Sequence, residues 1–169
     1  MNIVLYPDEP LLCVAAPVET FGHKLEKAAT RMLEIMYENE GVGLAAPQVG
    51  LAQRFFVCHE PESDPMCLIN PEILDLEGAE TGDEGCLSLP QIYAPVERAA
   101  RIRVRALDLA GNPLDFEAHG LLARIIQHET DHLEGRIFLD RVDILTRQSK
   151  LKEWEELRAS PAFGEEMHD

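Results

Sequence analysis

The chain has 169 residues, of which 46% are hydrophobic and 27% are charged, an ordinary composition for a soluble globular protein. Its formal net charge of −16 excludes a broad nucleic-acid footprint and binding to anionic membranes, because both need clustered Lys and Arg. No run reaches the ~18 apolar residues of a spanning helix, and a signal peptide pattern is missing. We therefore expect a cytoplasmic protein with no DNA partner and no membrane partner.

The first part of the chain predicts an arm, a helix and a loop. Residues 1–19 contain three prolines, which favour an extended arm. Residues 25–39 have apolar side chains at spacings of three and four, as an amphipathic helix does. Residues 41–50 read GVGLAAPQVG, and the three glycines with Pro47 predict a loop that passes close to a ligand or to other backbone.

A phosphate-binding loop is the competing interpretation of this segment. It is weak, because neither GxGxxG nor GK[ST] is present and the neighbours are not basic. Gln48 is the polar side chain of the segment, with an amide donor and a carbonyl acceptor. It could hold a carbonyl oxygen or tie down the loop, and the residue alone favours the structural role.

The middle of the chain predicts strands. They are expected over residues 53–58, 66–70, 72–76, 102–107 and 114–118. Residues 84–90, EGCLSLP, allow an irregular backbone at Gly85 before alternation resumes. A helix ending at Gly135 follows, then an extended piece and a helix over about 143–158 with Asp143 as N-cap. Residues 159–169 predict a flexible tail, and the order of elements predicts an α+β fold.

The four cysteines are expected to stay reduced, as is usual in the cytosol. Cys58 and Cys67 lie in strand-like apolar runs, where a thiol behaves as a small hydrophobic group. Cys13 has a similar setting. Only Cys86 lies among glycine and polar residues, so Cys86 is the thiol that fits a functional site.

Residues 127–135, QHETDHLEG, contain an HExxH signature. On a helix, His128 and His132 lie one turn apart on one face, so both can reach the same ion. The alternative is that the two histidines have this spacing by chance on a solvated helix. The preceding residues 120–127 are mostly apolar, however, which predicts a buried helix whose polar groups need partners. Glu129 adds a carboxylate that can take and return a proton of water.

A catalytic zinc or iron site uses three protein ligands and leaves one position for water. Downstream of His132 the only histidine is His168, in the predicted tail. Upstream, Cys86 would complete an N2S ligand set for zinc or ferrous iron.

The segments GVGLAAPQVG, EGCLSLP and QHETDHLEG, in this order and at these separations, resemble the three signature motifs of peptide deformylase. The resemblance implies a single catalytic domain over residues 1–169. In it, antiparallel or mixed β-sheets wrap around a central buried helix that carries HExxH, with an N-terminal and a C-terminal helix. It also implies a metal-dependent hydrolase that removes the formyl group from the N-terminal formylmethionine of new polypeptides and releases formate.

The resemblance assigns a role to each matching residue. The metal ligands are Cys86, His128 and His132. Water activated by the metal attacks the formyl carbon with Glu129 as general base and acid. The oxyanion is stabilised by Gln48 and the Leu87 N–H. The substrate-binding residues are Val42, Gly43, Gly85, Leu121 and Ile125.

The implied cofactor is one divalent metal ion per chain, with Fe2+ native and Zn2+, Ni2+ or Co2+ in purified protein. The implied partners are N-formylmethionyl peptides and nascent chains, with a transient ribosome contact through the C-terminal helix, although a solvated helix is the favoured interpretation. A Glu84–Arg98 pair that fixes the Cys86 loop is also implied, and it would contribute little if it were exposed. Residues 91–93 depart from the family pattern at the site entrance.

Two other functions stay open from the sequence. A zincin-like metallopeptidase would need a third ligand after His132. A non-catalytic metal-binding or ribosome-associated relative would keep the metal without releasing formate.

Overall fold

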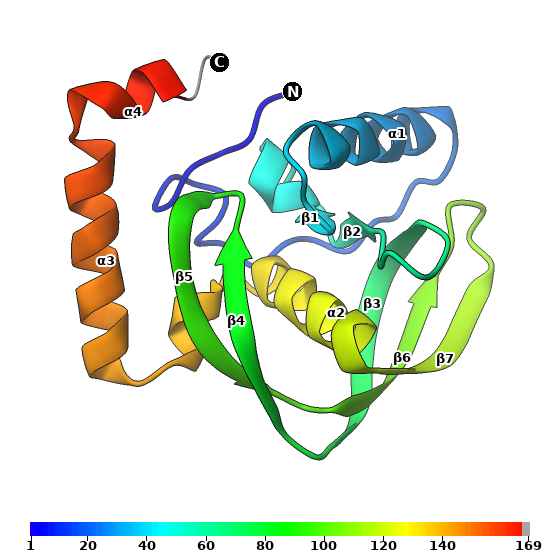
Figure 1. Ribbon diagram of the computed structural model, residues 1–169. Helices are drawn as coiled ribbons and strands as arrows, with labels where there is room; N and C mark the ends of the chain where they lie inside the picture. Colours follow the sequence, from blue (N-terminus) through cyan, green and yellow to red (C-terminus); the bar gives the residue numbers. More distant parts are fainter. Residues whose placement is uncertain (167–169) are drawn as a thin grey trace.

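The computed structural model describes residues 1–166 of the chain. Figure 1 shows helix α2 at the centre of the molecule, with strands on two sides of it and α1 above. The helices are α1 (His23–Glu38), α2 (Gly120–Leu133), α3 (Ile144–Arg158) and α4 (Pro161–Glu166), with short 3-10 helices η1 (Ala46–Val49) and η2 (Phe138–Arg141). The strands are β1 (Gly43–Ala45), β2 (Phe55–Cys58), β3 (Met66–Glu77), β4 (Glu80–Cys86), β5 (Leu89–Arg98), β6 (Arg101–Leu107) and β7 (Pro113–His119).

Five strands form one antiparallel sheet in the order β1-β2-β3-β6-β7. Strand β6 shows how the sheet receives α2. Its apolar residues Ile102 and Val104 are buried with Ile126 of α2, whereas the arginines between them face outward. This alternation follows from the period of two in a strand, and it places α2 against one face of the sheet.

Strand β2 is buried on both faces. Phe56 packs in the cluster that contains α2, whereas Phe55 packs with Met32 and Met36 of α1 in a second cluster. The two helices therefore lie on opposite sides of this part of the sheet, which explains why FFVC is apolar without alternation.

Strands β4 and β5 form a separate antiparallel hairpin. Its apolar residues, including Ile92 and Val96, pack with Phe138 of η2 and Trp154 of α3. The Trp154 Nε1–H donates to the Tyr6 carbonyl at 3.0 Å. The hairpin is therefore supported by the C-terminal elements, and α2 lies between it and the larger sheet (Figure 1).

Much of the predicted architecture is confirmed. The α+β fold, with antiparallel sheets around the helix that carries HExxH, is the observed one. The N-terminal helix begins two residues before its predicted start at 25. The C-terminal helix has the predicted cap, because the Asp143 carboxylate accepts from the Thr146 N–H at 2.8 Å. Gly135, with φ +74°, follows the end of α2.

Several predicted boundaries are wrong. The strands predicted over 66–70 and 72–76 are one strand, β3, in which the register shifts after Ile69 and Asn70 has φ +52°. The predicted loop over 41–50 contains β1 and η1. Residues 91–98, which were not predicted as a strand, belong to β5. The two prolines of β5 concealed it, but a two-stranded hairpin tolerates proline on an open edge.

The C-terminal part also differs from the prediction. The expected extended piece contains the turn of η2. Residues 161–166 of the predicted tail form α4, and Phe163 lies edge-on against Trp154 with 5.5 Å between ring centroids. Burying this aromatic ring gives the segment an apolar anchor, so a tail without regular structure is wrong for these residues. Residues 167–169 lie outside the described part.

The four cysteines are all free. Burial raises the pKa of the Cys58 and Cys67 thiols to about 12, as expected for thiols inside the sheet. Cys13 is exposed, so the expectation that it packs like the other two is wrong. Within residues 1–166, none of the helices has the length and apolar character needed to cross a membrane.

Candidate active site

Cys86, His128 and His132 come together although they lie on two different elements. Cys86 ends β4, and the two histidines lie one turn apart on α2. One donor atom from each residue lies within 4.8 Å of the other two, and the Cys86 Sγ is 3.3 Å from the His132 Nε2. The predicted convergence is therefore present.

The chemistry of these three side chains fits a metal ion. One thiol and two imidazoles are the donors that zinc and ferrous iron accept, and three protein ligands leave a coordination position open. Two buried atoms beside them, Glu129 Oε2 and His132 Nδ1, have no hydrogen-bond partner among the described residues. Buried polar atoms usually have a partner, so these two atoms could still accept or donate a bond to a group held in the site. His168 lies outside the described residues.

Glu129 lies beside the three donors. Its Oε1 is 3.7 Å from the His128 Nε2, and burial raises the pKa of its carboxyl to about 7. A carboxyl with a pKa near neutrality can both accept and return a proton. The α2 helix and β1 are in close contact here, because a Cβ at Gly43 would be 2.9 Å from the Glu129 Cγ. A side chain at this position would therefore have to displace Glu129.

Glu84 orients His128. Its Oε1 lies 2.8 Å from the His128 Nδ1. Burial opposes ionisation of Glu84, but hydrogen bonds from Arg98 and His128 lower the pKa of its carboxyl to about 2. An ionised carboxylate can only accept, so the His128 Nδ1 carries the proton and the Nε2 is left for a metal.

The predicted Glu84–Arg98 pair is present, but it is not exposed. Arg98 makes a two-bond contact with Glu84 at 2.9 Å for each bond, and it donates to Asp131 at 2.6 Å. The side chains of Glu84 and Arg98 are only 5% and 4% exposed. The sequence could not reveal the burial, because Arg98 ends a strand that the pattern had not identified.

Gln48 has the structural role considered from the sequence, and its amide donor lies beside Cys86. Its Oε1 accepts from the Ala45 N–H at 2.9 Å, which ties down the loop. Its Nε2 donates to the Ser88 Oγ at 3.2 Å and to the Cys86 Sγ at 3.4 Å. Because the Gln48 Oε1 is bound to the Ala45 N–H, the Gln48 Nε2 points towards Cys86.

A cavity of about 570 Å³ opens beside these groups. The predicted substrate-binding residues all line it: Val42, Gly43, Gly85, Leu121 and Ile125. So do the predicted catalytic residues: Gln48, Leu87 and Glu129. Cys86 and His128 reach the cavity, whereas His132 is fully buried behind them.

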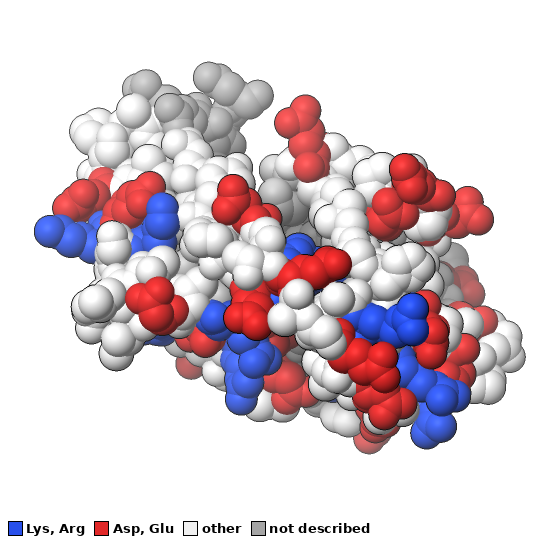
Figure 2. Space-filling model, turned by 60° about the horizontal axis from the view of Figure 1, so that its bottom comes forward, with Lys and Arg blue, Asp and Glu red and all other residues white. Residues whose placement is uncertain are grey.

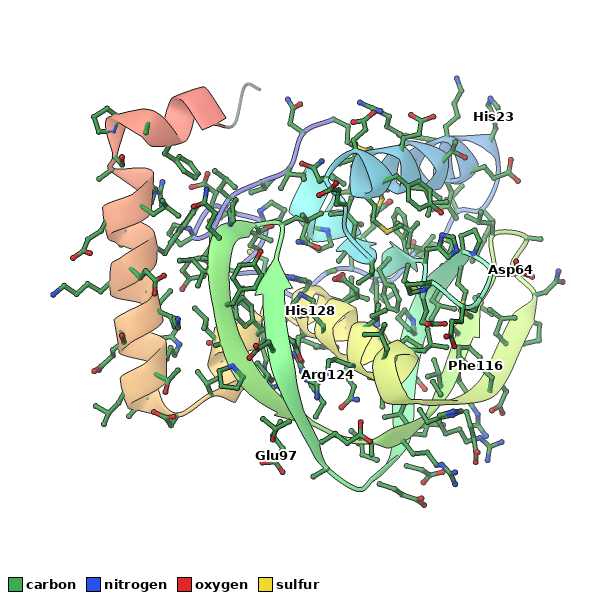
Figure 3. All side chains as sticks on the ribbon, in the orientation of Figure 1. His23, Asp64, Glu97, Phe116, Arg124 and His128 are labelled. Atoms are coloured by element: carbon green, nitrogen blue, oxygen red, sulfur yellow. The ribbon has the colours of Figure 1, made fainter. Side chains whose placement is uncertain are left out.

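Tyr93, which the sequence placed at the site entrance, lines the cavity, and so does Arg124, which had no predicted role. Tyr93 lies against Gly85, where a Cβ would come within 2.6 Å of the aromatic ring. Arg124 lies on α2, one turn before His128 (Figure 3). A single arginine in the otherwise apolar segment GLLARIIQ was the available signal for Arg124.

Comparisons with known proteins find one family. The family model described as polypeptide deformylase matches residues 1–148. The chain is 50% identical over 160 residues to a peptide deformylase of Alkalilimnicola ehrlichii, covering 93% of this chain and 90% of the relative. It is 46% identical over 154 residues to one of Neisseria gonorrhoeae, covering 90% and 92%.

Solved structures give the same result. A peptide deformylase from Legionella pneumophila is 40% identical, with a TM-score of 0.85 and coverage of 94% of this chain and 96% of that one. A peptide deformylase from Synechococcus elongatus in complex with actinonin is 38% identical, with a TM-score of 0.86 and coverage of 91% and 85%.

Proposed function

The chain belongs to the polypeptide deformylase family, and we propose that it hydrolyses the formyl group from the N-terminal formylmethionine of new polypeptides. The products are formate and a peptide with a free amino terminus. The observation that carries this proposal is the joint presence of Cys86, His128 and His132 beside Glu129, at the inner end of one cavity.

The three ligands would hold one divalent ion, with Fe2+ as the native metal and Zn2+, Ni2+ or Co2+ in purified protein. When bound, such an ion acts as a Lewis acid that lowers the pKa of water towards neutrality. The mixed thiol and imidazole donor set supports this group of metals over Mg2+ or Ca2+, which prefer oxygen ligands.

Glu129 is the general base and acid of the proposed reaction. Its carboxylate accepts a proton from the attacking water, and the protonated carboxyl then delivers that proton to the leaving amine as the bond between carbon and nitrogen breaks. Its burial and its pKa of about 7 support both halves of this cycle.

Gln48 and the Leu87 N–H stabilise the negative charge that develops on the formyl oxygen. The bond from the Ala45 N–H to the Gln48 Oε1 fixes the orientation of the amide, so its donor is already aimed at the Cys86 side before substrate binds. A donor that is fixed in advance stabilises the transition state without reorganisation.

The formylmethionyl side chain would occupy the apolar part of the cavity, formed by Val42, Leu121 and Ile125. The following peptide backbone would lie beside Val42 and Gly85 as an additional strand. Two features support this mode: within residues 1–166, β1 and β4 each pair with one neighbouring strand, and both border the cavity.

We expect nascent chains to be the partners and the cytoplasm to be the location. A ribosome contact through α3 would use its basic side chains. Three of them already form ion pairs, Arg147 with Asp140, Lys150 with Glu153 and Arg158 with Glu155. This pairing favours a solvated helix. On the face shown in Figure 2, basic side chains likewise lie beside acidic ones.

The proposal is tested with protein prepared anaerobically and three peptides: formyl-Met-Ala-Ser, acetyl-Met-Ala-Ser and a longer unformylated peptide. We expect formate from the first peptide and slow or no hydrolysis of the other two. Internal cleavage of the unformylated peptide would identify an endopeptidase. Bound metal with no formate from the formylated peptide would identify a non-catalytic relative, and either result contradicts the proposal.

A further inference from the structure

Arg124 links α2 to the β4–β5 hairpin. Its side chain is only 14% exposed. The guanidinium Nη1 donates to the Glu84 Oε2 at 2.7 Å and to the Val96 carbonyl at 2.8 Å, and the Nη2 donates to the Glu80 carbonyl at 2.8 Å. Figure 3 shows Arg124 and His128 on α2 beside the hairpin. One side chain thus contacts both strands that support Cys86.

With Arg124 in place, each oxygen of the Glu84 carboxylate accepts two hydrogen bonds. Its Oε1 accepts from the His128 Nδ1 at 2.8 Å and the Arg98 Nη2 at 2.9 Å. Its Oε2 accepts from the Arg98 Nε at 2.9 Å and the Arg124 Nη1 at 2.7 Å. Two donors on each oxygen fix the plane of the carboxylate. Arg124 therefore helps to hold the oxygen that orients His128.

The hairpin also leaves room for this contact. A Cβ at Gly82 would be 3.4 Å from the guanidinium of Arg124, so the backbone of β4 passes close to this side chain. Because Cys86 comes from the hairpin whereas His128 and His132 come from α2, the distance between these two elements sets the geometry of the three metal ligands.

We propose that Arg124 is a positioning residue of the metal centre, which acts through Glu84 and the hairpin carbonyls to hold Cys86 in place relative to His128 and His132. This inference rests on the proposed function and deepens it. Groups that orient metal ligands typically change metal affinity or activity by about 10- to 100-fold when they are removed. Arg124 is one step further from the ligands, so we expect about 10-fold.

The test compares Arg124→Met and Arg124→Lys with the wild type after loading with Co2+. Arg103→Met is the matched control, because Arg103 binds a carboxylate on the outer face of the sheet. We expect Arg124→Met to lose Co2+ to a chelator about 10-fold faster and to change the visible absorption bands of the ion. The kcat for formyl-Met-Ala-Ser should fall with little change in KM. Arg124→Lys should lose Co2+ at a rate between those of Arg124→Met and the wild type. An ammonium group can replace the bond to Glu84, but it cannot reproduce the several directed bonds of the planar guanidinium.

A double variant tests whether Arg124 acts through Glu84. In a Glu84→Gln background, Arg124→Met should accelerate metal loss by much less than 10-fold. If Arg124→Met or Arg124→Lys lowers only the thermal midpoint and leaves the Co2+ spectrum and metal loss at wild-type values, the proposal is wrong. These metal readouts do not depend on turnover, so a wild type that releases no formate would contradict the proposed function and leave this test intact.

Discussion

Two clusters of arginine and carboxylate side chains have similar geometry in very different surroundings. The inner cluster is Glu84, Arg98 and Asp131, behind the candidate metal ligands. The outer cluster is Arg103, Arg105 and Asp115, on the outward face of β6 and β7. Arg98 and Arg103 each make a two-bond contact with a carboxylate, at 2.9 Å and at 2.9 to 3.0 Å. The side chain of Arg98 is 4% exposed, however, and that of Arg103 is 45% exposed.

The difference shows that distance alone does not determine what an ion pair contributes. Water and salt screen the outer cluster, so little energy depends on it. In the inner cluster, removing one partner leaves a buried charge with less compensation, and water cannot replace the lost contact. The inner cluster also fixes the proton on His128, which gives it a functional role that the outer cluster lacks.

The largest effect is expected at Glu129, a buried carboxylate that lies beside the inner cluster and outside it. Glu129→Gln keeps the shape of the side chain but cannot accept a proton. We expect kcat for formyl-Met-Ala-Ser to fall by roughly 10²- to 10⁴-fold, as general base catalysis typically contributes. Metal content, measured in the same sample, should stay near the wild-type value. Wild-type turnover in this variant would contradict the role of Glu129.

The next effect tests the inner cluster itself. Arg98→Met removes the shared partner of Glu84 and Asp131, both of which are buried. We expect the free energy of unfolding to decrease by about 3 kcal/mol, measured by urea denaturation, because the two carboxylates lose the buried counter-charge that they share and keep only Arg124 beside Glu84 and Arg141 beside Asp131. A loss no greater than that of Arg103→Met would break the comparison between the clusters.

A smaller effect is expected where β1 passes Glu129. Gly43→Ala adds a Cβ that would lie 2.9 Å from the Glu129 Cγ and 3.2 Å from the Ile125 Cγ2. Such overpacking costs about 1 to 3 kcal/mol. Because Glu129 must move, kcat should fall more than the thermal midpoint suggests. If stability decreases while kcat remains unchanged, the close contact does not position Glu129.

Cys67 supplies a test of pH dependence inside the sheet. Burial raises the pKa of its thiol from 9.0 to about 12, so the folded state favours the protonated form. The resulting stability is present below pH 9 and is lost as the pH rises towards 12. Relative to Cys67→Ala, the wild type should lose about 1 kcal/mol of unfolding free energy between pH 9 and 10. A difference that does not change with pH would contradict the raised pKa.

The smallest effect is expected in the outer cluster. Arg103→Met should leave the urea midpoint and the kcat at wild-type values, because both partners of the pair are accessible to water. Added salt should not change this result. A loss of stability comparable to that of Arg98→Met would show that the outer cluster contributes as much as the inner one.

The sequence predicted the three long helices and the convergence of Cys86, His128 and His132 well, for physical reasons. The spacing of His128 and His132 is a local property of one helix. Cys86 was distinguished by its glycine and polar neighbours, and the N-cap at Asp143 depends only on the next three residues. Local patterns of this kind survive folding because the tertiary structure does not need to override them.

Features that depend on packing between distant segments could not be predicted well from the sequence. The burial of Arg98, the contacts of Arg124 and the strand β5 all depend on how the hairpin lies against α2. The exposure of Cys13 is likewise set by segments far along the chain. No pattern within 10 or 20 residues contains that information.

The most direct test of the account measures metal and formate in the same anaerobic samples of the wild type and of Cys86→Ala. The account predicts one divalent ion per chain and formate release from formyl-Met-Ala-Ser in the wild type. Cys86→Ala should lose both while keeping the fold, as judged by circular dichroism. Formate release at the wild-type rate by Cys86→Ala, or by wild-type protein stripped of its ion, would contradict the central claim that these residues form the metal centre of a deformylase.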